Sequence, residues 1–341
     1  MLRRGFITAG TVAAATFAAA PAWATGGLDT FAPSASPTPW PQSIRVLLGS
    51  GLATVIDERS FAFGSRQFRG SFSALPDGGI VNTVSLEEYL YSVVPMESPP
   101  SWPPEALKAQ AIVARTYAAS RINPTRAYDV VASQRDQAYG GLRAEYPQST
   151  TACDATSGQV LRWNGAVASV SYMSCCGGHT EDPADAWVGG ADVPYLKGVA
   201  CTYCNASPDY HWMRQFSMTS VSNAMASRLQ EIGSVQAIDV ARSDASGRAK
   251  SIRFTGESGS LEISGADFRR LMGPSVVRSL LIHSITVSAA ASTQAAPIVT
   301  IEGSGSGHGV GLCQWGSRGL AAQGRQARDI LAFYFPGIQI Q

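Results

Sequence analysis

The chain has 341 residues, enough for one large domain or two smaller ones. Its 26 lysines and arginines almost balance its 25 aspartates and glutamates, so the formal net charge is +1. This balance excludes the basic surface that nucleic-acid binding requires, and we expect no nucleic-acid partner. A neutral polymer such as a sugar chain is compatible with it.

Residues 1–24 have the pattern of a twin-arginine-type signal peptide. Arg3 and Arg4 precede an apolar run rich in alanine, and residues 22–24 form an A-x-A cleavage pattern. The run is shorter than the roughly 20 residues that cross a bilayer, so we expect no transmembrane segment after cleavage. An ordinary secretory signal or an uncleaved anchor is the alternative. We expect an exported protein of the periplasm or cell envelope.

Residues 25–41 predict a Pro-rich linker, because four prolines stand among small polar residues. Short apolar runs with β-branched residues follow and predict strands at 43–48, 52–56 and 79–84.

The strongest helix signal covers residues 105–121, which are dominated by helix formers. Ser101 is the expected N-cap, prolines 103 and 104 suit the opening turn, and Asn123-Pro124 ends the helix. The many alanines permit close packing, so this helix is expected to be buried at the centre of the fold.

The rest of the chain alternates short strands and helices. Residues 159–172 predict a hairpin that turns at Asn164-Gly165. The character changes after Cys204, and residues 206–295 are predicted to form an inserted subdomain. The sequence therefore predicts an α+β fold, with mixed strands packed around an Ala-rich central helix and an inserted smaller subdomain flanking a cleft.

Glu97 is the candidate catalytic residue. It follows an apolar segment and has Pro95, Met96 and Trp102 as neighbours in sequence. A carboxyl placed against apolar groups loses hydration, which raises its pKa and lets it act as a general acid near neutral pH. The alternative is a glutamate at a loop surface that caps the following helix.

Residues 303–316 form a glycine-rich loop after a predicted strand. The loop lacks the G-x-G-x-x-G pattern because Val310 occupies the third glycine position, and no Walker lysine follows, so we expect no nucleotide or other organic cofactor. A lone His308 in such a loop is often structural. Gln314 and Trp315 favour a sugar-binding surface.

Several segments, in this order, carry a family resemblance. They are residues 86–119, 139–141, 155–161, 177–181, 303–316 and 330–337. Together they resemble the stage II sporulation protein D family (SpoIID/LytB, which includes amidase enhancers). The resemblance covers roughly residues 42–205 and 296–341, which would form the SpoIID-like catalytic core.

The resemblance implies a function on peptidoglycan. Members include lytic transglycosylases that cut glycan strands lacking stem peptides and leave 1,6-anhydromuramyl ends, and others described as enhancers of N-acetylmuramoyl-L-alanine amidases. The expected partners are therefore glycan strands and, in the alternative reading, an amidase. By resemblance Glu97 is catalytic, and the substrate-binding positions are Gln110, Arg115, Lys108, His308 and Gln314.

The cysteines allow two interpretations. Cys176, His179, Cys201 and Cys204 combine C-x-x-H and C-x-x-C spacings that build tetrahedral zinc sites. An oxidising compartment instead favours disulfides between the two clusters. A metal in some members of the resembled family favours structural zinc. Cys153 and Cys313 are interpreted as small buried residues.

Overall fold

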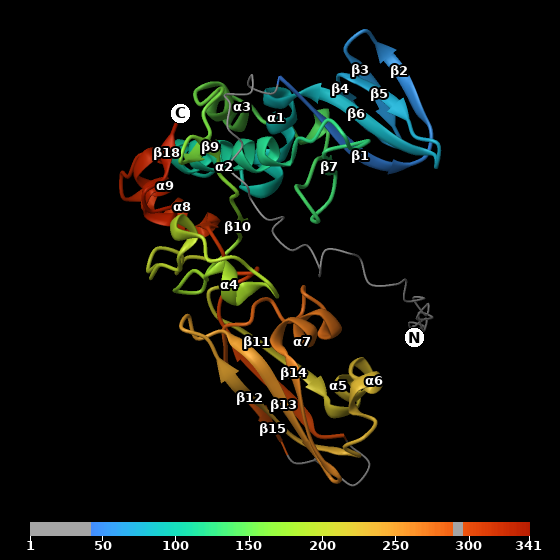
Figure 1. Ribbon diagram of the computed structural model, residues 1–341, viewed down its shortest axis with the longest axis vertical. Helices are drawn as coiled ribbons and strands as arrows, with labels where there is room; N and C mark the ends of the chain where they lie inside the picture. Colours follow the sequence, from blue (N-terminus) through green and yellow to red (C-terminus); the bar gives the residue numbers. More distant parts are fainter. Residues whose placement is uncertain (1–41, 289–295) are drawn as a thin grey trace, which may run out of the picture.

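The computed structural model describes residues 42–288 and 296–341 (Figure 1). The predicted signal peptide and linker lie outside these residues. Within the described part of the chain, no helix is long and apolar enough to cross a membrane. The mixture of helices and small sheets confirms the predicted α+β fold.

Two small sheets form the N-terminal part of the fold, at the blue end of the ribbon in Figure 1. The first has the strand order β5-β6-β1-β7, and the second has the order β2-β3-β4. Their bounds are β1 Ser43–Ser50, β2 Ala53–Asp57, β3 Ser60–Phe63, β4 Arg66–Arg69, β5 Ser71–Ala74, β6 Gly79–Ser85 and β7 Val130–Val131.

Three helices pack beside these sheets: α1 (Leu86–Glu97), α2 (Pro104–Arg121) and α3 (Pro147–Asp154). The Ser85 side chain caps α1 by accepting from the Glu88 N–H. Helix α2 is the predicted Ala-rich helix, and it contacts α1, α3, α8 and α9. Small side chains on most of its surface allow this close approach from several sides, so α2 lies at the centre of the core.

The C-terminal segment returns to α2 and completes the core. Helices α8 (Gln314–Ala322) and α9 (Ala327–Tyr334) pack on α2, and β17 (Leu312–Cys313) pairs in parallel with β10 (Tyr172–Met173). The remaining elements of the core are β8 Leu161–Trp163, β9 Ala166–Val167, β18 Gln339–Ile340, α4 Pro183–Ala186 and the short 3-10 helices η2 Leu142–Ala144 and η3 Pro194–Leu196.

The inserted subdomain is the lower part of Figure 1 and has its own hydrophobic core. Two three-stranded sheets, β11-β16-β15 and β12-β13-β14, pack with three helices. The bounds are β11 Trp212–Ser217, α5 Met218–Ala224, α6 Ala226–Leu229, β12 Val235–Ser243, β13 Ala249–Gly256, β14 Gly259–Ser264, α7 Gly265–Met272, β15 Ile282–Val287 and β16 Ile298–Gly303.

Strand β16 belongs to this subdomain, although the sequence placed residues from 296 onward in the catalytic core. It lies between β11 and β15, and its Val299 and Ile301 are buried in the subdomain's apolar cluster. The packing boundary therefore falls near Gly303, where the chain enters the glycine-rich loop.

Arg248 joins the subdomain to the core. Its guanidinium donates to the carbonyl oxygens of Cys176 (2.8 Å) and His179 (3.0 Å), and it lies 3.7 Å from the Glu181 carboxylate. Gly309 passes so close that an added Cβ would lie 2.7 Å from the guanidinium carbon. A glycine is therefore required at this point of the loop.

Candidate functional site

Glu97 is the last residue of α1, and its side chain lies where three segments of the core meet. One carboxylate oxygen accepts from the backbone N–H of Ala138 at 3.2 Å. The other lies 3.5 Å from the side-chain nitrogen of Gln314 at the start of α8. The helix end therefore presents one carboxyl group to a set of neutral donors.

Gln110 and Gln314 lie together beside this carboxyl group. The Gln314 side-chain nitrogen is 3.4 Å from the side-chain oxygen of Gln110, and both residues are buried. The Gln110 side-chain nitrogen has no hydrogen-bond partner among the described residues. The structure thus brings together three of the residues predicted from sequence: one from α1, one from α2 and one from α8.

Burial raises the pKa of Glu97 above its usual value of 4.5. Hydrogen bonds from the Ala138 N–H, the Gln314 amide and the Tyr172 hydroxyl stabilise the carboxylate and lower the pKa, but they do not cancel the loss of hydration. No charged side chain among the described residues contributes to the shift. The site therefore shifts the carboxyl group toward its protonated form, which is the direction that a general acid requires.

Tyr172 is a site residue that sequence reasoning missed. Its hydroxyl donates to Glu97 and accepts from the side-chain nitrogen of Gln137 at 3.1 Å. The Gln137 side chain is itself held by the Tyr89 hydroxyl and the carbonyl oxygen of Ala114. Only the pairing of β10 with β17 brings Tyr172 to Glu97, so no local sequence pattern could have revealed it.

Two tryptophans pack near the glutamines. The rings of Trp102 and Trp315 meet edge to face, with their centroids 5.1 Å apart, and Arg318 stacks over Trp315. Trp102 is buried, whereas Trp315 is partly exposed. An aromatic face next to Gln314 suits contact with a sugar ring, as the sequence suggested.

Arg115 does not face Glu97, which corrects its predicted place in the cleft. Its side chain is completely buried and forms a bidentate ion pair with Glu87, with distances of 2.9 and 2.6 Å. Its other nitrogens donate to the carbonyl oxygens of Cys153 and Gln159. Arg115 is five residues from Gln110, roughly 140° around the helix, so its side chain leaves α2 on a different face from that of Gln110.

Lys108 and His308 do not contact the Glu97 carboxylate directly. Lys108 pairs with Glu105 at 2.7 Å near the start of α2. His308 accepts from the Val310 N–H through Nδ1 and donates through Nε2 to the carbonyl oxygen of Tyr172. Burial lowers the pKa of His308 to about 4, so the ring is neutral and supports the Tyr172 backbone.

Four buried cysteines form a second polar cluster. The sulfur atoms of Cys176, Cys201, Cys204 and Cys313 all lie within 4.8 Å of one another. Cys313 replaces the predicted ligand His179, whose Nδ1 instead lies 2.6 Å from the Thr180 carbonyl oxygen. The predicted four-residue set is therefore corrected at one position.

The sulfur spacing fits a metal better than a disulfide. The sulfur atoms of Cys176 and Cys204 lie 3.5 Å apart, at hydrogen-bond distance, and all six cysteines are free thiols. A disulfide requires a sulfur separation of about 2.05 Å. Four thiolates at about 2.3 Å from a tetrahedral ion would be separated by about 3.8 Å. The four side chains could therefore hold a metal ion.

Cys313 connects the cysteine cluster to the Glu97 site through the start of α8. Its sulfur caps that helix by accepting from the Gly316 N–H at 3.3 Å, and it also accepts from the Cys176 N–H at 3.2 Å. The next residue is Gln314, which reaches Glu97. The cysteine cluster therefore fixes the helix end that positions Gln314.

Two segments of the chain match known families. Residues 77–163 match the family described as stage II sporulation protein, and residues 189–311 match a domain of unknown function. The first match contains Glu97 and Gln110, whereas Gln314 lies beyond both.

Three relatives illustrate the range of similarity. An uncharacterized protein of Brachyspira hyodysenteriae is 33% identical over 286 residues, covering 82% of this chain and 74% of the relative. The stage II sporulation protein D of Bacillus subtilis is 26% identical over 279 residues, with 76% and 75% covered. The amidase enhancer of the same organism is 28% identical over 296 residues, with 73% and 39% covered. The chain belongs to the stage II sporulation protein D (SpoIID/LytB) family.

Proposed function

We propose that this protein cleaves peptidoglycan glycan strands by a lytic-transglycosylase-type reaction, on glycan that lacks stem peptides. The observation that carries the proposal is the protonatable carboxyl group of Glu97, half-buried among neutral donors at the junction of α1, α2 and α8. A related protein is named an amidase enhancer, which supports a role at the cell wall.

In this mechanism Glu97 acts first as an acid and then as a base. Its proton passes to the glycosidic oxygen as the bond from the anomeric carbon to that oxygen breaks. The 6-hydroxyl oxygen of the same muramic acid then bonds to the anomeric carbon, and the hydroxyl proton returns to the Glu97 carboxylate. The product has a 1,6-anhydro end, and no water is consumed.

The single carboxyl group distinguishes this reaction from ordinary glycoside hydrolysis, which uses two carboxyl groups at defined separation. A second carboxyl group would have to come from another acidic residue of the core, such as Glu181, Asp182 or Asp185. Each is committed elsewhere: Glu181 to Ser246 and Arg248, and the two aspartates to lysine side chains. No acidic residue contributes to the pKa shift of Glu97 within the described chain. This arrangement supports the one-carboxyl reaction.

Gln110 and Gln314 act here as positioning residues. Both are almost completely buried, so they orient the Glu97 carboxylate more directly than they meet a substrate. Their contacts are long, at 3.4 and 3.5 Å, and leave a donor of Gln110 without a partner.

We further propose that the cysteine cluster binds structural zinc. Four protein thiolates would fill the tetrahedral coordination shell and leave no position open for a substrate. Zinc would then support the start of α8 and take no part in the reaction. Metal analysis of the purified protein tests this; less than one zinc per chain together with formed disulfides would contradict it.

The second candidate function is a non-catalytic enhancer of an amidase, favoured by the similarity to the amidase enhancer. The two functions separate when purified protein is incubated with denuded glycan in the absence of any amidase. We expect release of anhydro ends by the wild type, by a Glu231→Gln control at an exposed site, and not by Glu97→Gln. Absence of cleavage, with stimulation of an added amidase, would establish the enhancer. Both functions fit export to the periplasm or cell envelope.

A further inference from the structure

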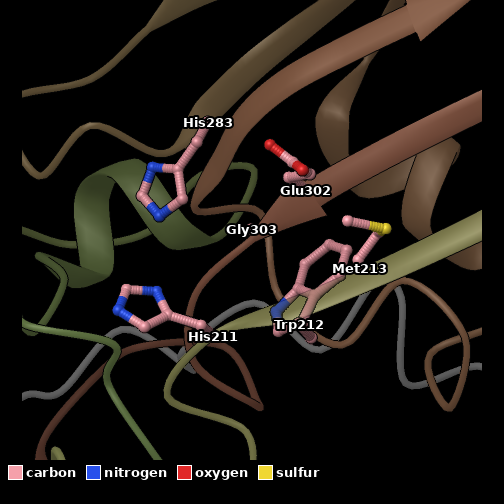
Figure 2. A pocket seen from close by; sticks show the side chains of 6 residues that line it. All are labelled: His211, Trp212, Met213, His283, Glu302 and Gly303. Atoms are coloured by element: carbon pink, nitrogen blue, oxygen red, sulfur yellow. The ribbon is translucent and has the colours of Figure 1, made fainter.

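The inserted subdomain contains a hollow that the proposed reaction does not use. It lies at the end of the β11-β16-β15 sheet nearest the core, and it has a volume of about 400 Å³. Figure 2 shows two imidazole rings on one side of it and Glu302 nearby. The lining residues are His211, Trp212, Met213, His283, Glu302 and Gly303.

His211 and His283 converge on one hydroxyl group. The Nδ1 atom of His211 lies 3.0 Å from the Ser304 side-chain oxygen, and the Nε2 atom of His283 lies 2.7 Å from the same atom. The two ring centroids are 6.4 Å apart. One ring nitrogen from the residue just before β11 and one from β15 therefore meet at the Ser304 oxygen.

The fold holds this set of donors in place. Ser304 is almost completely buried, its N–H donates to the Leu281 carbonyl oxygen at 2.9 Å, and its own carbonyl oxygen accepts from Ser279. Trp212 lines the hollow, and its ring N–H donates to the Gly305 carbonyl oxygen at 2.9 Å. The hydroxyl group is thus fixed, while both histidines are exposed to entering solutes.

We propose that His211, His283 and Ser304 form a site for a first-row transition metal ion such as Zn²⁺ or Ni²⁺. Imidazole nitrogen is a preferred ligand of these ions, whereas Ca²⁺ and Mg²⁺ prefer oxygen. Donors at about 2.0 Å from one ion are separated by about 3 Å. The two nitrogen-to-oxygen distances at Ser304 match this value.

Glu302 adds negative charge to the same hollow. Its carboxylate lines the site and accepts from the Ser284 hydroxyl at 3.0 Å, which leaves further oxygen lone pairs for the ion or for its bound water. The two ring nitrogens and the hydroxyl oxygen make a nitrogen-and-oxygen site, and this carboxylate lines the same hollow. It differs in chemistry from the cysteine cluster and does not depend on the proposed glycan reaction.

Hydrogen bonding alone is the competing explanation. A serine hydroxyl has one proton, so it can donate to one ring while the other ring donates to its oxygen. That arrangement needs both imidazoles neutral and in matching tautomers, and it would bind no metal. The two explanations therefore predict different results in a metal titration.

The test uses the full-length protein with its thiolate cluster already loaded with Zn²⁺, titrated with Ni²⁺ in a calorimeter. Tetrahedral thiolates retain zinc against Ni²⁺, because soft thiolate ligands in tetrahedral geometry select zinc, whereas Ni²⁺ prefers square-planar or tetragonal nitrogen and oxygen ligands. We expect one Ni²⁺ per chain, and binding weakened by about tenfold or more in His211→Ala and in His283→Ala. His179→Ala is the matched histidine control and should bind as the wild type does.

X-ray absorption at the nickel edge identifies the ligands in the same samples. Nitrogen and oxygen neighbours without sulfur support the site. Sulfur neighbours, no binding by the wild type, or unchanged binding by the His211→Ala/His283→Ala double variant would overturn the proposal. Because both histidines are exposed, these variants are expected to keep the fold, and circular dichroism checks this.

Discussion

The Glu97 site and the cysteine cluster are both polar groups in a buried setting, but they are built differently. The cysteine sulfurs are fully buried and form a closed set within 4.8 Å. Glu97 is only half-buried, and its glutamine contacts are long, at 3.4 and 3.5 Å. A closed set of ligands suits a structural role, whereas loosely held donors around one protonatable group suit chemistry on an entering substrate.

The two sites nevertheless share the start of α8, with Cys313 in one and Gln314 in the other. This connection makes the comparison testable. Changes in the cysteine cluster should affect the stability of the whole core and, through α8, the reaction. Changes around Glu97 should affect the reaction with little loss of stability.

The largest expected effect on stability comes from Cys313→Ser. Removing one of four ligands should abolish tight metal binding and lower the free energy of unfolding by about 5 kcal/mol or more. Cys153→Ser is the matched control, because Cys153 is an equally buried free thiol outside the cluster. Thermal unfolding and metal content measure both variants. Equal stability of Cys313→Ser and Cys153→Ser would contradict a structural role for the cysteine cluster.

The Arg115–Glu87 pair is the next test, because it separates structural from substrate-binding residues on α2. Glu87→Ala leaves the buried Arg115 guanidinium without its carboxylate, which should cost about 3 kcal/mol of unfolding free energy. Activity per folded molecule should stay near that of the wild type. If Glu87→Ala kept normal stability but lost most of its activity, a substrate-binding role for Arg115 would be supported instead.

Gln314→Ala should reduce activity by about tenfold, as expected for loss of a hydrogen bond to a charged group, and should hardly change stability. The Gln314 amide stabilises the Glu97 carboxylate, so its removal should raise the pKa of Glu97 further. The acid role requires the protonated form, and activity therefore falls as pH rises through that pKa. The falling limb of the pH–rate profile should move to higher pH, whereas Lys108→Ala should leave it in place.

The smallest expected effect is the pH dependence of stability. The pKa of Glu97 is higher in the folded state than its usual 4.5, so the folded state binds the proton more tightly. Wild-type stability should therefore decline as pH rises from 4.5 through the folded-state pKa, by about 1.4 kcal/mol for each unit of upward shift. Glu97→Gln should lack this decline. Parallel pH–stability curves would mean that Glu97 is hydrated in the folded protein.

The sequence predicted the parts of the site that depend on local pattern. Glu97, Gln110 and Gln314 lie in segments that carry the resemblance seen in the sequence, and the structure brings their side chains together. Helical periodicity alone could not place Arg115, because a cation on one face of a helix can point to a cleft or to a buried carboxylate. Its partner Glu87 lies 28 positions earlier in the chain.

Long-range pairing accounts for what the sequence missed. The parallel pairing of β10 with β17 aligns Tyr172 with Leu312 and Met173 with Cys313. This one contact brings Tyr172 to Glu97 and Cys313 to the other cysteines. The spacing of Cys176 and His179 suggested a ligand pair, but no local spacing could indicate a cysteine more than a hundred residues away. Strand β16 was assigned to the core for the same reason, because its partners β11 and β15 come from the insertion.

The most direct test of the central claim is a mass spectrum of the products that the purified protein releases from denuded glycan strands. We predict fragments with 1,6-anhydromuramyl ends, lighter by one water than hydrolysis products, from the wild type and none from Glu97→Gln. Hydrolysis products from the wild type, or anhydro fragments from Glu97→Gln at the wild-type rate, would contradict the account.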